Sequence, residues 1–572
     1  TMSVPAVVGL SSKGIFTLDT AEPYNEKYIR EESTEKNIRS ILFSPKGNYL
    51  AYRTDRKAEI LKCSDWSVVA KVEKNIKEMV FSPLDTYFTV WEMFMITKEN
   101  PQGFPNLHIY KSENGTLVKS LIQKSQGGWE PKWSSDEKIF ALKSGNNVQI
   151  YENGDFEKYT QSVHDEKLKT FSVSPSIAPN YYVSIFTPCT SKQPSSWKVF
   201  QHPNYRQAVV TRSSFQADKA VFHWNRRGTN VLTLTQTEID KTGGSYYGKQ
   251  SLSHGDTKGN SGNMVFSKEG PIHAVSWNPG NWNEWLAVYG HAPAKATIFN
   301  AKCDPLYEFG TGAWNTIYFP PEGNHILFNI FAKLMTTHWS MEIWDVRGYK
   351  KIGACGSPTT TLLQWDPRGE CFVTATTYPR LTVDNQYKLW HYTGVLMHKK
   401  KCEEKENLLA IAWQPGNYPK SELSKTVPKA IEDSTPKPAQ AYRPPGARNK
   451  PPSTFTLHEH EKPHKPGEVP AASASKAAIK QREKREARKA RKAEERAADP
   501  SPALNTSNSP KPAFVSTGDL DKDKKIRNLN KKLSDIEKLK QQLAAGKQLE
   551  LNQRAKVDSE ASLLQELAQL KL

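Results

Sequence analysis

Long apolar segments are missing from this 572-residue sequence: no run approaches the 18 apolar residues that indicate a membrane-spanning helix. Residues 1–5 also lack the basic segment, followed by an apolar one, that marks a secretory signal. Both absences argue against a membrane-spanning or secreted protein. We therefore expect an intracellular protein that works in the cytoplasm and makes no contact with a membrane.

Cysteine is scarce: the chain has six, they are scattered, and none forms a C-x-x-C pair. The sequence also has no H-E-x-x-H motif and no cluster of Cys and His, so it shows no pattern of a metal site. The G-x-S-x-G motif of serine hydrolases is absent as well. We expect free thiols in a reducing compartment, no metal, no cofactor and no catalytic residues, hence a protein that is not an enzyme.

One segment comes close to a nucleotide-binding motif. Residues 243–250 meet G-x-x-x-x-G-K, but a Walker A loop continues with a Ser or Thr that binds Mg²⁺, and here that residue is Gln250. A Walker A loop also leads from a strand into a helix, whereas this segment lies between two expected strands. We interpret it as a loop or hairpin tip, in which Tyr246 and Tyr247 are candidate partner-docking residues.

Tryptophan is absent beyond Trp413, although the chain has 15 tryptophans between Trp66 and Trp413. The charge is divided in the opposite way, because residues 420–572 carry +12 of the total formal charge of +19. The chain therefore divides into a core-forming part, 1–419, and a polar, basic part. Such a concentration of positive charge favours a polyanionic partner.

A turn motif recurs along residues 1–419: an aromatic or aliphatic residue, followed by a short polar turn that often contains Pro or Gly. Its nine copies begin at Phe43, Phe81, Trp133, Val173, Trp224, Trp277, Phe319, Trp365 and Trp413. They span 370 residues in eight intervals, a mean of about 46 residues. Strand-like runs flank the copies, and Pro and Gly suit the hairpin between two strands. This period is typical of four-stranded propeller blades.

Nine copies predict an all-β, WD-like propeller of nine blades over 1–419. The ninth copy, at Trp413, is followed by a Pro-rich segment and lacks its remaining strands. Residues 6–10 and 14–18 can supply them, and closing the ring in this way removes exposed sheet edges. Eight blades is the alternative, if the copy at Val173 or at Trp133 is a loop.

The segment 420–475 is predicted to be a Pro-rich linker, since 12 Pro fall between residues 415 and 470 and no hydrophobic period is present. It contains an aromatic and basic cluster in which Tyr442 and Arg443 are candidate partner-docking residues.

Residues 476–498 are predicted to form a basic helix, because they are rich in Ala, Glu, Lys and Arg. Ten basic and four acidic residues lie between Lys476 and Arg496. A helix that is polar all round has no core face. It is either a solvated tether or an RNA-binding helix whose charges neutralise phosphates, and we favour the second. The candidate RNA- or ribosome-binding residues are Lys480, Arg482, Lys484, Arg485, Arg488, Lys489, Arg491 and Lys492.

A second linker, 499–518, leads into residues 519–572, where helical periodicity returns. Apolar residues recur at intervals of three or four before Gly546 and again after it, which predicts two amphipathic helices. They can form a hairpin, dock on another protein, or pair as a coiled coil. The start of the first helix adds further candidate RNA- or ribosome-binding residues: Lys522, Lys524, Lys525, Arg527, Lys531 and Lys532.

Six strings in the loops and the tail are more specific than the repeat. They occupy residues 240–248, 293–300, 387–394, 441–445, 546–550 and 563–567. In this order they resemble the eukaryotic translation initiation factor 2A family, over essentially the whole chain.

The resemblance implies a propeller initiation factor that binds the small (40S) ribosomal subunit. Its implied role is to direct initiator methionyl-tRNA to that subunit in a codon-dependent and GTP-independent way. The implied partners are therefore the 40S subunit, with its rRNA and proteins, initiator methionyl-tRNA, mRNA indirectly, and other initiation factors. The alternative is an interaction scaffold that its basic tail tethers to the ribosome or to RNA without carrying tRNA.

Overall fold

The computed structural model describes residues 4–214, 216–238, 248–329, 341–419, 423, 426–432, 461–467, 520–544 and 551–571. The chain separates into two compact units, residues 1–471 and 472–572. Within these described ranges, the first unit contains nine four-stranded antiparallel sheets, and the second contains three helices. None of the helices in the described ranges is both long enough and apolar enough to cross a membrane.

Each sheet is one blade, and the blades are numbered here in chain order. Blades 1 to 3 are β4(Ser40–Phe43), β5(Tyr49–Arg53), β6(Ala58–Lys62) and β7(Val68–Val72); β8(Ile76–Phe81), β9(Tyr87–Glu92), β10(Leu107–Lys111) and β11(Leu117–Leu121); and β12(Lys132–Trp133), β13(Ile139–Ser144), β14(Asn147–Glu152) and β15(Gln161–His164). Blades 4 to 6 are β16(Thr170–Val173), β17(Tyr182–Thr187), β18(Ser195–Gln201) and β19(Val210–Ser214); β20(Lys219–Trp224), β21(Asn230–Gln236), β22(Gln250–Asp256) and β23(Ser261–Asn263); and β24(Ile272–Trp277), β25(Glu284–Tyr289), β26(Ala294–Asn300) and β27(Pro305–Gly312).

Blades 7 and 8 are β28(Thr316–Tyr318), β29(His325–Asn329), β30(Met341–Asp345) and β31(Lys350–Cys355); and β32(Leu362–Trp365), β33(Cys371–Thr376), β34(Gln386–His391) and β35(Leu396–Lys401). Blade 9 combines both ends of the unit: β36(Leu408–Trp413), β1(Val7–Ser11), β2(Gly14–Leu18) and β3(Glu26–Glu31). The prediction of nine blades closed by the N-terminus is therefore confirmed. The third N-terminal strand, β3, was not expected.

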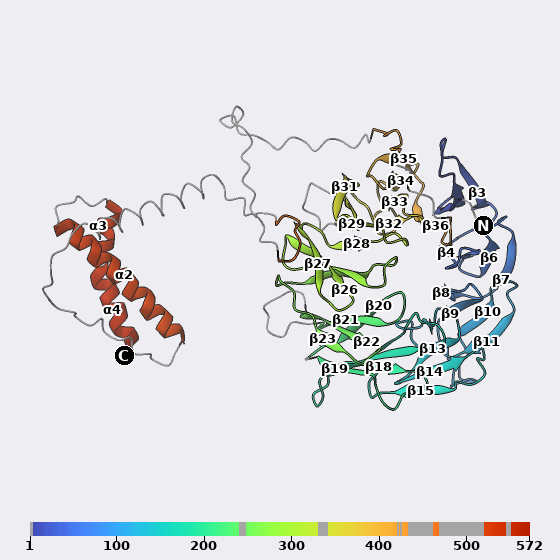
Figure 1. Ribbon diagram of the computed structural model, residues 1–572, viewed down its shortest axis with the longest axis horizontal. Helices are drawn as coiled ribbons and strands as arrows, with labels where there is room; N and C mark the ends of the chain where they lie inside the picture. The colour runs from blue at the N-terminus through green and yellow to red at the C-terminus, as the bar shows by residue number, and fades with distance from the viewer. Residues whose placement is uncertain are drawn as a thin grey trace. The chain divides into compact units, whose positions relative to one another are not determined.

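The strands follow one another around a ring, and β36 lies close to the N-terminus and β4 (Figure 1). The first strand of a blade contacts the first strand of the next, as in the pairs β16 with β20, β24 with β28 and β36 with β4. First strands therefore line the centre, and fourth strands form the outer edges.

The core consists of nine apolar clusters, one at each boundary between neighbouring blades. The cluster between blades 9 and 1 joins Val8 and Leu10 of β1 to Leu50 and Tyr52 of β5. Burial of apolar surface at this boundary stabilises the closed ring at about 25 cal/mol per Å² removed from water. The closing boundary is thus built in the same way as the other eight.

The recurring turn motif has a structural cause. The polar residue after the aromatic accepts a hydrogen bond from the backbone that re-enters the blade: Ser44 Oγ from the N–H of Tyr49 at 2.9 Å, and Ser82 Oγ from that of Tyr87 at 2.8 Å. The Gly of the motif has a positive φ, +76° at Gly47, and residues other than Gly rarely adopt this backbone conformation. The motif therefore encodes the hairpin between the first and second strands.

Neighbouring turns are also linked to one another. The buried carboxylate of Asp85 in blade 2 accepts hydrogen bonds from Ser44 Oγ at 2.7 Å and the Lys46 N–H at 2.8 Å in blade 1. At the closing boundary, Gln414 Nε2 donates to the Gly47 carbonyl at 2.8 Å. These bonds fix one turn relative to the next around the ring.

The helical unit contains α2(Leu520–Ala544), α3(Leu551–Asp558) and α4(Glu560–Lys571). Ile526 and Leu529 of α2 are buried against Leu567 of α4. An ion pair between Lys540 and Glu560 also joins these two helices. The predicted linker 499–518 and basic helix 476–498 lie outside the described residues, as does most of 420–475, so these boundaries stay predictions.

Gly9 in β1 allows a direct test of ring closure, because it pairs with Phe16 of β2 and the phenyl ring covers it. A Cβ at Gly9 would lie 2.1 Å from Phe16 Cζ. We expect Gly9→Val to lower the free energy of unfolding by about 1–3 kcal/mol, as overpacking of a core does. Thermal or urea unfolding measures the change, and Gly127→Val, at an exposed glycine where an added Cβ would make only an ordinary contact with Ser125 Oγ at 3.8 Å, is the control. Equal stability of the two variants would contradict a closing role for β1.

Candidate RNA- and protein-binding surfaces

The two ends of the propeller differ in their connections. In an antiparallel blade, successive connections leave at alternate ends, so all first turns share one end with the connections between third and fourth strands. We call this the first-turn end. Its first turns are five to eight residues long. At the opposite end, the connections between second and third strands reach 14, 13 and 11 residues in blades 2, 5 and 7.

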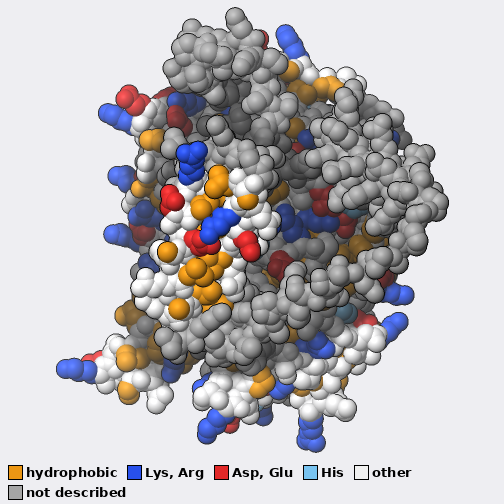
Figure 2. Space-filling model, turned by 90° about the vertical axis from the view of Figure 1, so that its left-hand side faces the viewer, with side chains coloured by type: hydrophobic (Ala, Val, Ile, Leu, Met, Phe, Trp, Pro, Cys, Tyr) orange, Lys and Arg blue, Asp and Glu red, His pale blue; other side chains and the backbone are white. Residues whose placement is uncertain are grey.

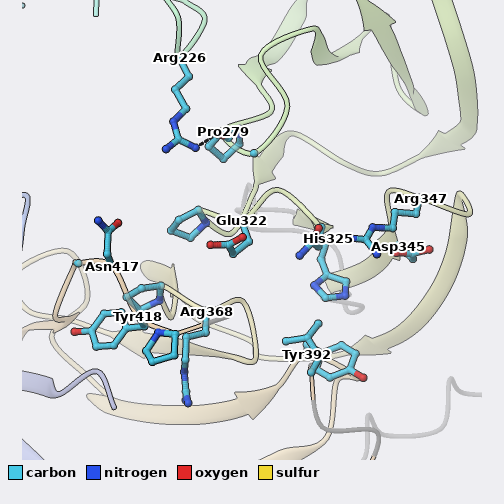
Figure 3. A pocket seen from close by; sticks show the side chains of 17 residues that line it. Arg226, Pro279, Glu322, His325, Asp345, Arg347, Arg368, Tyr392, Asn417 and Tyr418 are labelled. Atoms are coloured by element: carbon cyan, nitrogen blue, oxygen red, sulfur yellow. Dashed lines mark hydrogen bonds between the residues drawn. The ribbon is translucent and has the colours of Figure 1, made fainter. Parts of the chain in front are cut away.

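The first-turn end contains a cavity of about 1150 Å³. First turns of blades 5 to 8 and residues 416–419 and 423, which follow β36, contribute to its wall. Arginines enter it from three different blades: Arg226, Arg347 and Arg368 (Figure 3). Glu322 and Asp345 also line the cavity, so its charge is mixed with a small positive excess.

The three arginines are held to different degrees. Arg368 forms ion pairs with Asp366 at 3.3 Å and with Glu370 at 3.5 Å. Arg226 donates one hydrogen bond to the Pro279 carbonyl at 3.3 Å, and it is exposed. Arg347 is exposed and, among the described residues, has no ion pair. Two guanidinium groups are therefore available to a ligand.

The floor of the cavity is aromatic. The imidazole of His325, at the start of β29, lies between two rings: that of Tyr392 at 5.0 Å and that of Trp365 at 6.1 Å, both nearly parallel to it. His325 is 4% exposed, and its buried Nδ1 has no hydrogen-bond partner among the described residues. Burial lowers the pKa of His325 to about 4, so the ring is neutral near pH 7.

The opposite end presents apolar side chains instead. The connection 93–106 of blade 2 exposes Met93, Met95 and Ile96 by 61%, 62% and 62%. Its backbone is nevertheless fixed, since Gly103 packs on the Phe94 ring and the Phe104 N–H donates to the Met95 carbonyl at 3.2 Å. Exposed apolar groups on an ordered loop are typical of protein-binding surfaces, and Met side chains adapt readily to a partner.

A third feature lies on the outer edge of blade 6. Residues 461–467, here named the strap, pair with β27: the N–H groups of Glu308 and His464 each donate to the other residue's carbonyl at 3.0 Å. Lys295 Nζ, 2.8 Å from Glu308 and 3.2 Å from Glu461, joins both segments. Thus part of the predicted linker is bound to the propeller.

The same cluster is the candidate metal site of the described residues, with donor atoms of Glu308, Glu461 and His464 all within 4.8 Å of one another. The Lys295 ammonium already contacts both carboxylates, and its side chain is 7% exposed. A buried cation in this position takes the place that a metal ion would need, so we interpret the cluster as structural.

Few of the sequence-predicted site residues can be placed. The basic residues from Lys480 to Lys492, and the tyrosine and arginine candidates Tyr246, Tyr247, Tyr442 and Arg443, lie outside the described residues. Tyr246 and Tyr247 fall in the connection between β21 and β22, which are antiparallel partners, and Gln250 begins β22 rather than a helix. This arrangement differs from the strand-to-helix setting of a Walker A loop.

The remaining candidates belong to the helical unit. Lys522, Lys524, Lys525, Arg527, Lys531 and Lys532 all lie in α2, and Lys531 and Lys532 are exposed. In the space-filling view, blue Lys and Arg side chains project along the margins, with red acidic side chains among them (Figure 2). The described surface on that side is thus mixed in charge.

Sequence reasoning missed the cavity residues Arg226, His325 and Arg347. One signal was present, because Arg226 is part of the fifth copy of the turn motif. His325 follows the seventh copy of the motif, and Arg347 lies in the connection between β30 and β31. The sequence has no pattern that links these two residues.

Comparison with known proteins gives consistent matches along the chain. The family described as "Eukaryotic translation initiation factor eIF2A" matches residues 212–409, and its C-terminal domain family matches residues 524–570. The chain is 34% identical to eukaryotic translation initiation factor 2A of Drosophila melanogaster, covering 96% of this chain and 95% of that protein. It is 31% identical to the Schizosaccharomyces pombe protein of the same name, over 98% of this chain and 97% of that protein.

A solved structure agrees with the fold. The crystal structure of a eukaryotic initiation factor superposes with a TM-score of 0.65 and 29% sequence identity, covering 73% of this chain and 100% of that one.

The strap yields a prediction about the edge of β27. We expect Glu461→Ala to speed amide hydrogen exchange at Glu308 and Thr311 about tenfold, because their N–H groups donate to the strap. A tenfold change corresponds to a decrease of about 1.4 kcal/mol in the free energy of local opening. Exchange followed by mass spectrometry or NMR measures the effect. Lys462→Ala, a change at the exposed neighbour, is the control, and equal protection in both variants would refute anchoring by Glu461.

The buried His325 predicts a pH dependence of stability. Its folded-state pKa of about 4 lies below the unfolded value of about 6.5. The unfolded chain therefore takes up the proton first, and the stability present above pH 6.5 is lost as the pH falls toward 4. We expect His325 to account for a loss of roughly 1.5 kcal/mol between pH 6.5 and 5.

Urea unfolding at several pH values measures this slope, which His325→Gln should flatten even if it lowers stability at every pH. His291→Gln, at an exposed imidazole, is the control and should leave the slope as it is. An unchanged slope in His325→Gln would show that this imidazole does not resist protonation.

Proposed function

Because the chain belongs to the eukaryotic translation initiation factor 2A family, we propose that it binds the small (40S) ribosomal subunit in the cytoplasm and directs initiator methionyl-tRNA to it. In this proposal delivery depends on the start codon and does not require GTP. The partners are the 40S subunit, initiator tRNA, mRNA through the subunit, and other initiation factors.

The observation that carries the proposal is the division of charge. Residues 420–572 hold +12 of the +19, and ribosomal RNA and tRNA are polyanions. Among the candidates whose side chains the structure describes, Lys531 and Lys532 are exposed on α2. Binding driven by such residues releases counterions and weakens steeply with added salt.

Independence of GTP is supported by the segment that most resembles a Walker A loop. Its Gln250 stands where Ser or Thr would bind Mg²⁺, and it begins β22 in an antiparallel pair with β21. A backbone in that pairing cannot open the helix N-terminus that cradles phosphates.

A second function has its own supporting observation. The ordered connection 93–106, which exposes Met93, Met95 and Ile96, suits a protein partner. In this alternative the propeller is an interaction scaffold, tethered to the ribosome or RNA by its basic tail, and it carries no tRNA.

Direct binding of labelled initiator methionyl-tRNA by the purified chain, with and without 40S subunits, separates the two functions. Delivery requires tRNA to bind the chain alone, or to bind subunits with an AUG codon more tightly when the chain is present. The scaffold requires subunit binding with no gain in tRNA affinity. Repeating the assay without GTP tests nucleotide independence.

Removing tail charge should weaken binding to 40S subunits in a salt-dependent manner. Each phosphate contact contributes a slope of roughly −0.7 to −0.9 in log K against log salt. We therefore expect lower affinity and a flatter slope when glutamine, which largely keeps helix propensity, replaces Lys484, Arg485, Arg488, Lys489, Arg491 and Lys492.

The matched control removes the same charge from exposed propeller positions, one in each of blades 1 to 6: Lys62, Lys111, Lys158, Lys192, Lys258 and Lys302, each to Gln. It should change the slope less than the tail variant does. If the tail variant binds like the unchanged chain across the salt series, its basic residues do not contact phosphate.

A further inference from the structure

We propose that the cavity at the first-turn end binds a short segment of single-stranded RNA, with backbone phosphates on Arg226 and Arg347 and one base beside Tyr392 and His325. This inference rests on the proposed function, in which the chain works on RNA, and it names a propeller surface for that contact. The tail supplies general attraction, whereas the cavity supplies a shaped site.

The size of the cavity supports an occupant larger than a metabolite. Its volume, about 1150 Å³, lies above the range of about 300–1,000 Å³ typical of small-molecule sites. It opens at the end of the ring where first turns from several blades meet, so a chain can pass across it. A duplex is too wide to place its bases at the aromatic floor, which favours a single strand.

The arginines supply phosphate recognition. A guanidinium group offers a planar fork of donors that matches phosphate oxygens, and Arg226 and Arg347 are both exposed. They approach the cavity from different blades, Arg226 from blade 5 and Arg347 from blade 7 (Figure 3). Two forks from different blades suit two phosphates of one strand better than a single compact anion.

The floor of the cavity supplies base recognition. The buried Nδ1 of His325 has no partner among the described residues, and such a group costs free energy unless a ligand or water satisfies it. The ring is neutral near pH 7, so it adds no positive charge beside the base. Tyr392, stacked on His325 at 5.0 Å, provides the aromatic surface on which unpaired bases stack.

The acidic residues distinguish RNA from other polyanions. Glu322 and Asp345 line the same cavity as the arginines and would repel a densely charged ligand such as polyphosphate. Their carboxylates can accept hydrogen bonds from base amino groups and from ribose 2′-hydroxyls. A ligand that carries spaced phosphates and many donors therefore fits this mixture of charges.

The test uses the full chain and a fluorescently labelled ten-nucleotide single-stranded RNA of mixed sequence, with affinity measured by anisotropy across a salt series. We expect the double variant Arg226→Gln/Arg347→Gln to bind at least tenfold more weakly. Its salt slope should flatten by roughly 1.4, the amount for two phosphate contacts of a single strand. Tyr392→Ala should weaken binding with little change in that slope, since stacking releases no counterions.

The matched control, Arg56→Gln/Lys98→Gln, removes two exposed charges from connections at the opposite end of the ring and should bind RNA nearly as the unchanged chain does. Equal melting temperatures show that each variant folds. The proposal is overturned if the arginine variant keeps full affinity, or if an acidic peptide binds with the same arginine dependence and RNA does not.

Failure of the site and failure of the proposed function are separable. If the chain binds 40S subunits in a salt-dependent way while the cavity variants leave RNA affinity unchanged, the cavity proposal fails and the broader function stands. If the unchanged chain binds neither subunits nor RNA, both fail.

Discussion

Pairing of β1 with β36 is the interaction on which the first structural unit depends. It joins residues about 400 positions apart, from Val7 with Trp413 to Ser11 with Leu408, and it converts an open row of blades into a ring. Without it, two apolar blade faces and two strand edges would meet water. The cavity depends on the same pairing, since residues 416–419, which continue from β36, form part of its wall. Closure therefore stabilises the ring and also completes its candidate binding site.

The hydrogen bonds within the polar turns also fix the positions of side chains that line the cavity. Asp366 shows how, because its buried carboxylate accepts hydrogen bonds from the N–H groups of Glu370 at 2.8 Å and Cys371 at 3.3 Å, and it also holds Arg368. Burial raises the pKa of Asp366, and Arg368 and these N–H groups oppose that rise. One side chain thus shapes a hairpin and places a cavity arginine. The residues that make the repeat visible in the sequence also build the rim of the site.

Features encoded by a local stretch of sequence could be predicted, whereas features that depend on the assembled ring could not. Blade number and closure followed from the motif, because each copy carries the local chemistry of its own turn and because residues 6–10 and 14–18 are short, mostly apolar runs that can supply strands. Strand β3 was missed because its Glu, Lys and Arg side chains leave it partly exposed, without a clear apolar period. The cavity was missed because Arg226 and His325 line a common cavity only after the blades are ordered around a ring. Burial of a single histidine has no local signature.

The surfaces of this chain differ in the free energy that each can offer a partner. Charge on α2 acts over distance and is screened by salt, so it favours encounter over selection. The cavity combines arginine forks with an aromatic floor, and only a ligand that carries both phosphates and a flat ring gains from both contacts, which is a source of selectivity. The exposed Met93, Met95 and Ile96 of the connection 93–106 gain from water exclusion, which depends little on salt at moderate concentration. A factor that meets RNA and proteins together needs such separable contacts, because one type can then be lost or tuned without abolishing the others.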